Sequence, residues 1–387
     1  MKPFDRRNFL KTGAVSIAGL AIGKELKASP KNHHSSEPSR VITRKLGNTG
    51  IQIPIVSLGV GRCDSPAVVK GALKLGMNHF DTAHVYQQGN SEKMLGEVLK
   101  EYPRESFTIA TKVKTMNSKE KFMETLDTSL ERLQMDYVDI LYLHAKNNRK
   151  STLDAEMLEA LKMAKKLGKA KHLGVSTHSN EPEVIQAAID SGVYEVVLTS
   201  VNFKQEHSAQ LKEKIAEAAS KGIGIVGMKV MAGGYMDKEK LVPVNYTAAL
   251  KWVLQDENIH TTIPSMVNLE QLMNNASVLQ ELEFNEQEKN DLAFASELEG
   301  LFCNACSNCV KNCTKKLPIP ELMRAYMYSY GYGETQKAKA LVESLALNDN
   351  PCQNCNTCKA RCVKGFNIAE KINDINRLKR IPSEFLT

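Results

Sequence analysis

The sequence lacks both a membrane-spanning run and a large surplus of one charge. Its N-terminal apolar run, Thr12 to Ile22, is shorter and weaker than the roughly 20 apolar residues that a transmembrane helix needs. The net charge is +7, but residues 1–28 hold six Lys or Arg and two acidic residues, so they carry +4 and leave +3 on the remainder. With so small a surplus, neither nucleic acid nor an anionic membrane is predicted as a partner.

The chain also lacks the Gly-x-Gly-x-x-Gly turn that follows the first strand of a dinucleotide-binding doubly wound sheet. Instead, after a predicted hairpin at residues 43–53, strand-like and helix-like runs alternate over roughly 250 residues. The expected strands lie at residues 55–60, 77–80, 107–112, 138–144, 172–176, 196–200, 224–230 and 261–264. This rhythm predicts a (β/α)8 TIM barrel whose active site lies at the carboxyl ends of the strands.

Three consecutive predicted strands end in a chemically active side chain. These side chains are Asp81, Lys112 and His144, and Tyr86 follows the first of them in a polar loop that contains Gly89. Because parallel strands share one carboxyl edge, we expect the four groups to converge there. A helix-capping Asp and a surface Tyr are the ordinary interpretation of Asp81 and Tyr86 alone, and the matching strand ends favour a site instead.

The stretch from Gly76 to Tyr86, Gly-Met-Asn-His-Phe-Asp-Thr-Ala-His-Val-Tyr, matches the motif Gly-x-x-x-Phe-Asp-Thr-Ala-x-x-Tyr of the aldo/keto reductases. The Thr-Lys at Lys112 and the Leu-His at His144 match the same family in the same order. The chain therefore resembles these enzymes, which transfer hydride between a nicotinamide cofactor and a carbonyl or alcohol substrate. The resemblance implies that Tyr86 is the general acid, that Lys112 and Asp81 assist it, and that His144 positions the substrate oxygen.

Carbonyl reduction explains why these residue types are wanted. Hydride addition leaves negative charge on the oxygen, and a phenol with its free pKa of about 10 is a weak acid at neutral pH. A neighbouring ammonium group favours the phenolate. Lys112 is therefore expected to lower the pKa of Tyr86, while Asp81 holds Lys112 in place.

The later strand ends supply the nicotinamide contacts that the resemblance implies. The segment ending in Ser176 resembles the one that holds the carboxamide, and Asn202 matches an Asn after the sixth strand. Ser265 and Asn275 resemble the residues that bind the adenosine phosphate end. Gln271 stands where family members keep an Arg for the 2′-phosphate, so the expected cofactor is NADP or NAD with no preference between them.

Two positions depart from the family. Leu198 and Val201 stand where the resemblance calls for a Gln and a stacking aromatic ring, so a substitute such as Phe203 would be needed. Four further residues near strand ends are weaker candidates for lining the pocket: His178, Met228, Lys229 and Met231.

Eight of the nine Cys fall in two runs after Gly300, each spaced Cys-x2-Cys-x2-Cys-x3-Cys. The two runs are Cys303, Cys306, Cys309, Cys313 and Cys352, Cys355, Cys358, Cys362. This spacing places three thiolates round one 4Fe-4S cluster and sends the fourth to another, as in two-cluster ferredoxins, although the usual Pro after the fourth Cys is missing. Two 4Fe-4S clusters are the prediction, and a disulfide framework and zinc sites are the alternatives.

The segment between the two runs, residues 319–347, has apolar residues at helical spacing with interruptions at Gly331 and Gly333. A small, mainly helical, ferredoxin-like iron-sulfur domain is therefore expected, similar to electron-transfer subunits of the fumarate-reductase type. The alternating tyrosines at 326, 328, 330 and 332 are interpreted as packing beneath the clusters. The ninth cysteine, Cys63, is interpreted as a small buried side chain.

Paired arginines at positions 6 and 7, followed by Phe9, Leu10 and Lys11, resemble a twin-arginine export signal. The resemblance implies export by the twin-arginine machinery, with a periplasmic or otherwise exported location. Cleavage near Ala28 is expected, and an uncleaved signal that tethers the chain to the membrane is the alternative. The predicted parts are a signal at 1–28, a linker at 29–39, a barrel at 40–298 and an iron-sulfur domain at 299–387.

Two classes of function stay open. The first is an aldo/keto reductase-type enzyme linked to two clusters, acting on a small carbonyl or alcohol substrate, with a redox partner protein or a flavin to divide the electron pair. The second is an exported electron-transfer or assembly protein whose barrel is a catalytically lapsed binding platform. The four converging groups favour the first class, and the departures at Leu198, Val201 and Gln271 favour the second.

Overall fold

The computed structural model describes residues 41–205, 208–235, 242–297, 302–353, 355 and 358–386. The predicted export signal (1–28) and linker (29–39) lie outside the described residues. The chain from Arg40 to Thr387 forms one compact unit. Within the described ranges, no helix has both the length and the apolar character to cross a membrane.

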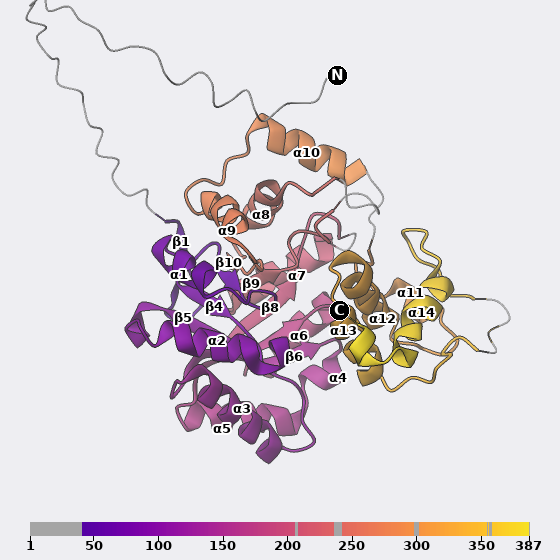
Figure 1. The fold of residues 1–387 in the computed structure, drawn as a ribbon, viewed down its shortest axis with the longest axis horizontal. Coiled ribbons are helices and arrows are strands. Elements are labelled where there is room, and N and C mark those ends of the chain that lie inside the picture. The colour runs from indigo at the N-terminus through magenta and orange to yellow at the C-terminus, as the bar shows by residue number, and fades with distance from the viewer. Residues whose placement is uncertain are drawn as a thin grey trace, which may run out of the picture. The chain divides into compact units, whose positions relative to one another are not determined.

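Eight parallel strands form one sheet in the order in which the chain reaches them (Figure 1). They are β3 (Leu58–Gly59), β4 (His79–Asp81), β5 (Thr108–Val113), β6 (Val138–Lys146), β7 (Ala170–Thr177), β8 (Val196–Ser200), β9 (Gly224–Met228) and β10 (Thr261–Thr262). Parallel bridges from Val56 to Thr262 and from Gly59 to Ser265 join the first strand to the last and close the sheet. The predicted strand order is confirmed, although β3 and β10 are shorter than expected because their pairing continues only as single bridges.

Helices α1 to α8 follow the strands on the outside of the barrel, and α9 and α10 come after the last strand (Figure 1). They are α1 (Pro66–Lys74), α2 (Asn90–Leu99), α3 (Lys119–Leu133), α4 (Arg149–Thr152), α5 (Ala155–Lys166), α6 (Glu181–Ser191), α7 (Ser208–Ser220), α8 (Tyr246–Leu254), α9 (Leu269–Ala276) and α10 (Glu286–Glu297). Short 3-10 helices are η1 (Tyr86–Gly89), η2 (Arg104–Ser106) and η3 (Ser277–Leu279). The apolar faces of the longer helices pack on the outside of the sheet in one large core.

The interior of the barrel is filled with side chains. Ile140, Tyr142 and Leu198 belong to an apolar cluster there, which also includes Leu46 and Ile53 from the predicted hairpin. The hairpin forms as expected, from the antiparallel strands β1 (Thr43–Lys45) and β2 (Gln52–Pro54). Because the interior is packed, the open carboxyl edge is where the barrel can present a site.

The described residues from Phe302 onwards form a mainly helical domain. Its elements are α11 (Asn308–Lys311), α12 (Ile319–Tyr326), the short π-helix η4 (Met327–Gly331), α13 (Thr335–Ser344), α14 (Ile368–Asn376) and the 3-10 helices η5 (Arg377–Arg380) and η6 (Ser383–Phe385). The domain has its own apolar core, in which Ile319 and Leu322 of α12 meet Val342 of α13 and Ile372 of α14.

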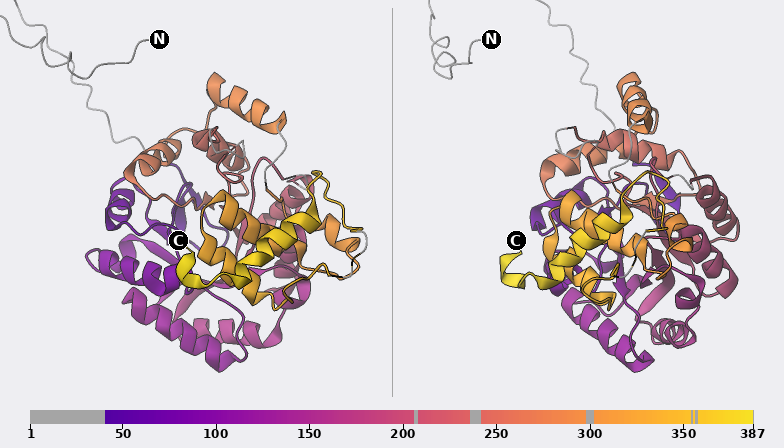
Figure 2. Two further views of the ribbon diagram at one scale, coloured as in Figure 1. Left: turned by 45° about the vertical axis from the view of Figure 1, so that its right-hand side comes forward. Right: turned by 90° about the vertical axis from the view of Figure 1, so that its right-hand side faces the viewer.

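The helical domain lies against the barrel (Figure 2). Phe302 lies between two glycines, because a Cβ added at Gly233 or at Gly331 would come within 2.8 or 2.9 Å of its ring. Ser179, just after β7, donates a hydrogen bond of 2.8 Å to Glu321 of α12, and both residues are buried. A buried polar contact of this kind fixes the position of α12 against the barrel.

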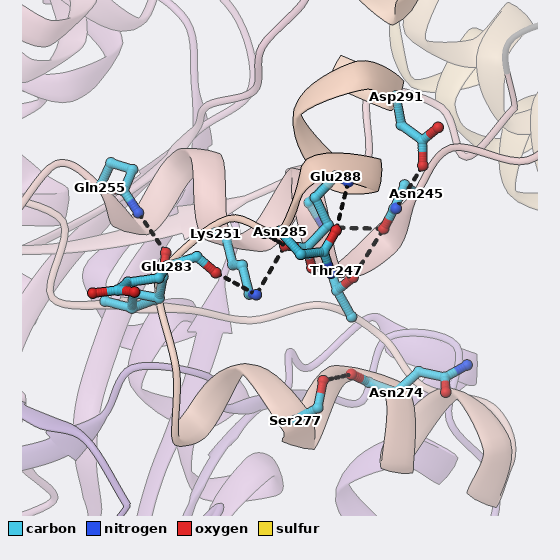
Figure 3. A network of polar contacts seen from close by, with 12 residues as sticks. Asn245, Thr247, Lys251, Gln255, Asn274, Ser277, Glu283, Asn285, Glu288 and Asp291 are labelled. Atoms are coloured by element: carbon cyan, nitrogen blue, oxygen red, sulfur yellow. Dashed lines mark hydrogen bonds and ion pairs between the residues drawn. The ribbon is translucent and has the colours of Figure 1, made fainter. Parts of the chain in front are cut away.

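A polar network joins α10 to α8 (Figure 3). Lys251 of α8 forms a 2.9 Å ion pair with Glu288 of α10 and donates a 2.7 Å hydrogen bond to the carbonyl oxygen of Glu283. Asn245, which caps α8, donates to Asp291 at 2.8 Å. Lys251 and Glu288 are almost fully buried, so each charge depends on the other.

We expect Lys251→Met to lower the free energy of unfolding by about 3–5 kcal/mol, because it leaves Glu288 buried without its partner. Urea denaturation followed by the fluorescence of Trp252, the single Trp of the chain, measures this. Lys289→Met is the matched control, because its ion pair with Glu286 on the same helix is exposed and should contribute less than about 1 kcal/mol. Equal losses in the two variants would contradict the prediction.

Candidate active site

A buried ion pair lies at the carboxyl edge of the barrel. Lys112, on β5, donates to the carboxylate of Asp81 at the end of β4 and to the carbonyl oxygen of Thr82 at 2.6 Å. The side chains of Asp81 and Lys112 are only 2% and 1% exposed. The second carboxylate oxygen of Asp81 is buried and has no hydrogen-bond partner. The expectation that Asp81 holds Lys112 in place agrees with this geometry.

Tyr86 opens the 3-10 helix η1 and lies over this pair. The ammonium nitrogen of Lys112 is 4.8 Å from the centroid of the Tyr86 ring, and the ring of His144 meets it edge-on at 5.9 Å. Gly61 packs against the other side of the ring, because a Cβ added there would lie 3.3 Å from it. The four groups predicted from the strand ends therefore meet in one place.

The expected lowering of the pKa of Tyr86 by Lys112 does not appear in this geometry. Burial raises the pKa of Tyr86, the carboxylate of Asp81 raises it further, and the cations that oppose the rise are Lys337 and Arg324. The reason is the position of Lys112, which points at Asp81 and faces the ring rather than the hydroxyl. Tyr86 thus keeps its proton at neutral pH.

His144 ends the predicted strand segment and is 7% exposed. Burial and then the charge of Lys112 hold the pKa of His144 well below its ordinary value, so the ring is neutral. Its Nδ1 atom has no partner. The next residue, Ala145, has a φ of +57°, and its N–H donates to the hydroxyl oxygen of Ser176 at 2.8 Å. Ser176 therefore supports the turn that presents His144.

A cavity of about 420 Å³ opens beside these groups, and Asp81 and Tyr86 line it. Of the five residues predicted to contact nicotinamide, Ser265, Gln271 and Asn275 are among its lining residues. Asn202 lines a smaller neighbouring cavity. All four of the weaker candidates line the larger cavity: His178, Met228, Lys229 and Met231.

The two departures from the family are apolar and buried. Leu198 lies in the barrel interior, and Val201 is 2% exposed. Phe203 packs against Trp252 at a ring distance of 6.4 Å and is not among the residues that line the larger cavity. Phe203 therefore does not replace the missing ring.

Sequence reasoning missed the contribution of the C-terminal domain to the cavity. Tyr328, Tyr332, Glu334 and Lys337 line it together with the barrel residues. The interpretation of the alternating tyrosines as packing is thus incomplete, because Tyr328 and Tyr332 reach the barrel. No local sequence signal distinguishes these four residues. Their spacing is the same as that of residues in a helix that packs only within its own domain.

The eight C-terminal cysteines lie in two groups. The fourth Cys of each sequence run lies in the group formed by the first three Cys of the other run. Cys303, Cys306, Cys309 and Cys362 line one small cavity. Burial raises the pKa of Cys352, and the neighbouring thiols of Cys355, Cys358 and Cys313 raise it further. No disulfide joins any of the nine Cys, all of which are described, and Cys63 is buried as expected.

Among the described residues, no set of three or more His, Cys, Asp or Glu side chains is placed to hold one ion. The four thiolates of a 4Fe-4S cluster each bind a different iron atom, so they stand further apart than four ligands of one zinc ion. The donor set and its exchange pattern fit such a cluster.

Comparison with known proteins gives the family. The model of the "Aldo/keto reductase family" matches residues 56–248. L-galactose dehydrogenase of Arabidopsis thaliana is 31% identical over 52% of this chain and 69% of its own length. The chain belongs to the aldo/keto reductase family. It is accordingly an oxidoreductase of the NAD(P)-dependent type.

Other members of the family share the barrel. Methylglyoxal reductase DkgB of Salmonella typhi is 28% identical over 62% of this chain and 92% of its own length. The solved structure of the holo form of aldo-keto reductase AKR11C1 from Bacillus halodurans superposes with a TM-score of 0.56 at 20% identity, over 67% of this chain and 97% of that one. At this identity the structural likeness shows the fold alone.

The buried, neutral His144 gives the stability of this family member a pH dependence. Its pKa is depressed in the folded chain, so it contributes stability that is present above pH 6.5 and is lost as the pH falls below that value. We expect the free energy of unfolding to fall less steeply below pH 6.5 in His144→Gln than in the wild type. Urea denaturation between about pH 5 and 8 measures both slopes, and equal slopes would contradict the prediction.

Proposed function

We propose that this chain reduces a carbonyl compound with a nicotinamide cofactor, with Tyr86 as the proton donor, and that its C-terminal domain holds two 4Fe-4S clusters. The observation that supports the first part most directly is the meeting of Tyr86, His144 and the Asp81–Lys112 pair, of which Tyr86 and Asp81 line the cavity. The second part is supported by the spacing and grouping of eight Cys.

Each residue has one role in the reduction. His144 donates a hydrogen bond to the carbonyl oxygen and thereby polarises the carbonyl carbon. Tyr86 donates its proton to the same oxygen, so that the product is an alcohol. The Asp81–Lys112 pair holds an ammonium group 4.8 Å from the ring centroid of Tyr86 and thereby fixes the floor of the site beneath the proton donor.

Nicotinamide supplies the hydride when it is bound. The residues that would hold its adenosine phosphate end are Ser265, Gln271 and Asn275 in the wall of the cavity. Asn275 is 4% exposed and its side-chain oxygen has no partner, which suits a ligand that donates a hydrogen bond there. Gln271 uses its side-chain oxygen to accept from the N–H of Val267 at 2.9 Å, so its amide nitrogen can donate to an NADP or NAD cofactor.

The two cysteine groups would each hold one cluster, and each fourth Cys would serve the group of the other run. Such clusters carry single electrons, whereas carbonyl reduction needs a pair. A redox partner protein or a flavin is therefore part of the proposal. The twin-arginine resemblance at Arg6 and Arg7 adds export of the loaded protein, which is consistent with clusters inserted before transport.

We expect Tyr86→Phe to lower kcat for aldehyde reduction by roughly 10²- to 10⁴-fold, because it removes the proton donor. The dissociation constant of NADPH, measured by nicotinamide fluorescence, should change little. Tyr137→Phe is the matched control, because Tyr137 contacts Arg104 and Lys171 away from the cavity. Equal loss of turnover and of cofactor binding would count against a proton-donor role.

We expect the anaerobically purified protein to contain about eight iron atoms and as many sulfides per chain. Cys362→Ser should lower this content, whereas Cys63→Ser should retain it, because Cys63 is buried in the barrel core. Iron and sulfide assays and low-temperature EPR of the reduced protein measure the outcome. A folded, iron-free protein with paired disulfides would overturn the cluster proposal.

A further inference from the structure

One wall of the active-site cavity carries cations from both domains, and both face the same tyrosine. Lys229 follows β9 of the barrel, and its ammonium nitrogen is 5.5 Å from the ring centroid of Tyr328. Lys337 belongs to α13, and its ammonium nitrogen is 4.6 Å from the same centroid. Both lysines and Tyr328 line the cavity.

Within the described part of the chain, Lys229 has no carboxylate partner. No acidic side chain of the described residues forms an ion pair with it, and Glu321, which contributes to its surroundings, is paired with Arg324. The backbone of Lys229 has a φ of +56°, a conformation that a residue with a side chain adopts at a cost. Strained backbone held in place beside a cavity is typical of a binding site.

Lys337 has a partner that it must share. Glu334 pairs with Lys337 at 2.8 Å and with Arg62 at 2.9 Å, so two cations meet one carboxylate. Together with the unpaired Lys229, this wall carries more positive than negative charge. The surplus is not balanced by Asp81, whose charge is taken up by Lys112.

The pKa of Tyr328 indicates the sign of the electrostatic potential at this wall of the cavity. Burial alone would raise the pKa of Tyr328, but Lys229, Arg324 and Lys337 outweigh burial, and the pKa is lowered. Tyr86, in the same cavity, has a raised pKa because burial and Asp81 dominate there. The positive potential is therefore concentrated at Tyr328, apart from the proton donor.

The separation between the proton donor Tyr86 and the positive region at Tyr328 limits the size of the ligand. Lys337 is 6.0 Å from the ring centroid of Tyr86 and 4.6 Å from that of Tyr328. His178 also lines the cavity, has an Nδ1 atom without a partner, and lies 6.3 Å from His144 between ring centroids. A small molecule can thus place its carbonyl group at Tyr86 and a second polar group at Tyr328.

We propose that Lys229, Lys337 and Tyr328 form an anion subsite that binds the carboxylate or phosphate group of a small carbonyl substrate. The inference rests on the proposed function of the same cavity and names its substrate class. Two ammonium groups and one phenol offer charge-assisted hydrogen bonds to an anionic oxygen. Because two of the three residues come from the C-terminal domain, the substrate preference depends on the docking of that domain.

Matched pairs of substrates test the subsite in the full-length, cluster-loaded protein. The carboxylate pair is 4-oxobutanoate and its methyl ester, and the phosphate pair is glycolaldehyde phosphate and glycolaldehyde. We expect the acid to exceed its neutral partner in kcat/KM by about tenfold or more in one of the pairs. The pair that shows the preference distinguishes a carboxylate substrate from a phosphate substrate.

Three variants test which residues cause the preference for the acid over its neutral partner. Lys229→Met and Lys337→Met should each reduce the ratio of acid to neutral kcat/KM by about tenfold, and Tyr328→Phe should reduce it less, because it removes one neutral donor. Lys162→Met, which removes an exposed lysine of α5, is the control and should leave the ratio unchanged. A ratio near one in the wild type, or one that no variant alters, overturns the subsite.

Binding of succinate, followed by calorimetry, separates the subsite from the proposed reaction. Loss of succinate binding in Lys337→Met supports the subsite even if no aldehyde is turned over, an outcome that would count against the proposed function alone. The pyrophosphate of the dinucleotide is the other anion that these residues could meet. If Lys337→Met weakens NADPH binding and leaves the acid-to-neutral ratio intact, the subsite is overturned in favour of a cofactor contact.

Discussion

The buried pair of Asp81 and Lys112 is the constraint on which the site depends. Two charges removed from water lose several kcal/mol of hydration each, and their attraction restores this only with good geometry and further hydrogen bonds. Here the carbonyl of Thr82 supplies one such bond. The pair forms only when β4 and β5 lie side by side in register, with Asp81 opposite Ala110. An apolar pair of similar volume would stabilise a barrel equally well, so the presence of charge indicates a role in chemistry.

The C-terminal domain changes what the barrel can do with that pair. Its residues Tyr328 and Lys337 share one cavity with Tyr86. The buried contact between Ser179 and Glu321 and the wedge of Phe302 hold this wall in place. A wall that excludes water strengthens every electrostatic interaction within the cavity. The proposed reaction and its proposed substrate preference therefore rest on residues of both domains.

The sequence predicted those parts of the structure that follow from local pattern and strand direction. Strands that end in Asp81, Lys112 and His144 could be aligned because parallel strands share one edge. The pKa of Tyr86 could not be predicted, since it depends on whether Lys112 points at the hydroxyl or the ring. The proposed roles of Tyr328 and Lys337 were also out of reach, because they depend on contacts between distant parts of the sequence, as the 6.0 Å approach of Lys337 to the ring centroid of Tyr86 shows.

The two cysteine groups differ in their relation to the barrel. Cys303 lines the smaller cavity together with His178 and Lys229, so its group faces the active site. Cys355, in the other group, is exposed. The first group thus lies beside the barrel, and a member of the second reaches solvent. Because Cys313 and Cys362 each belong to the group of the other run, loss of either group would loosen both loops.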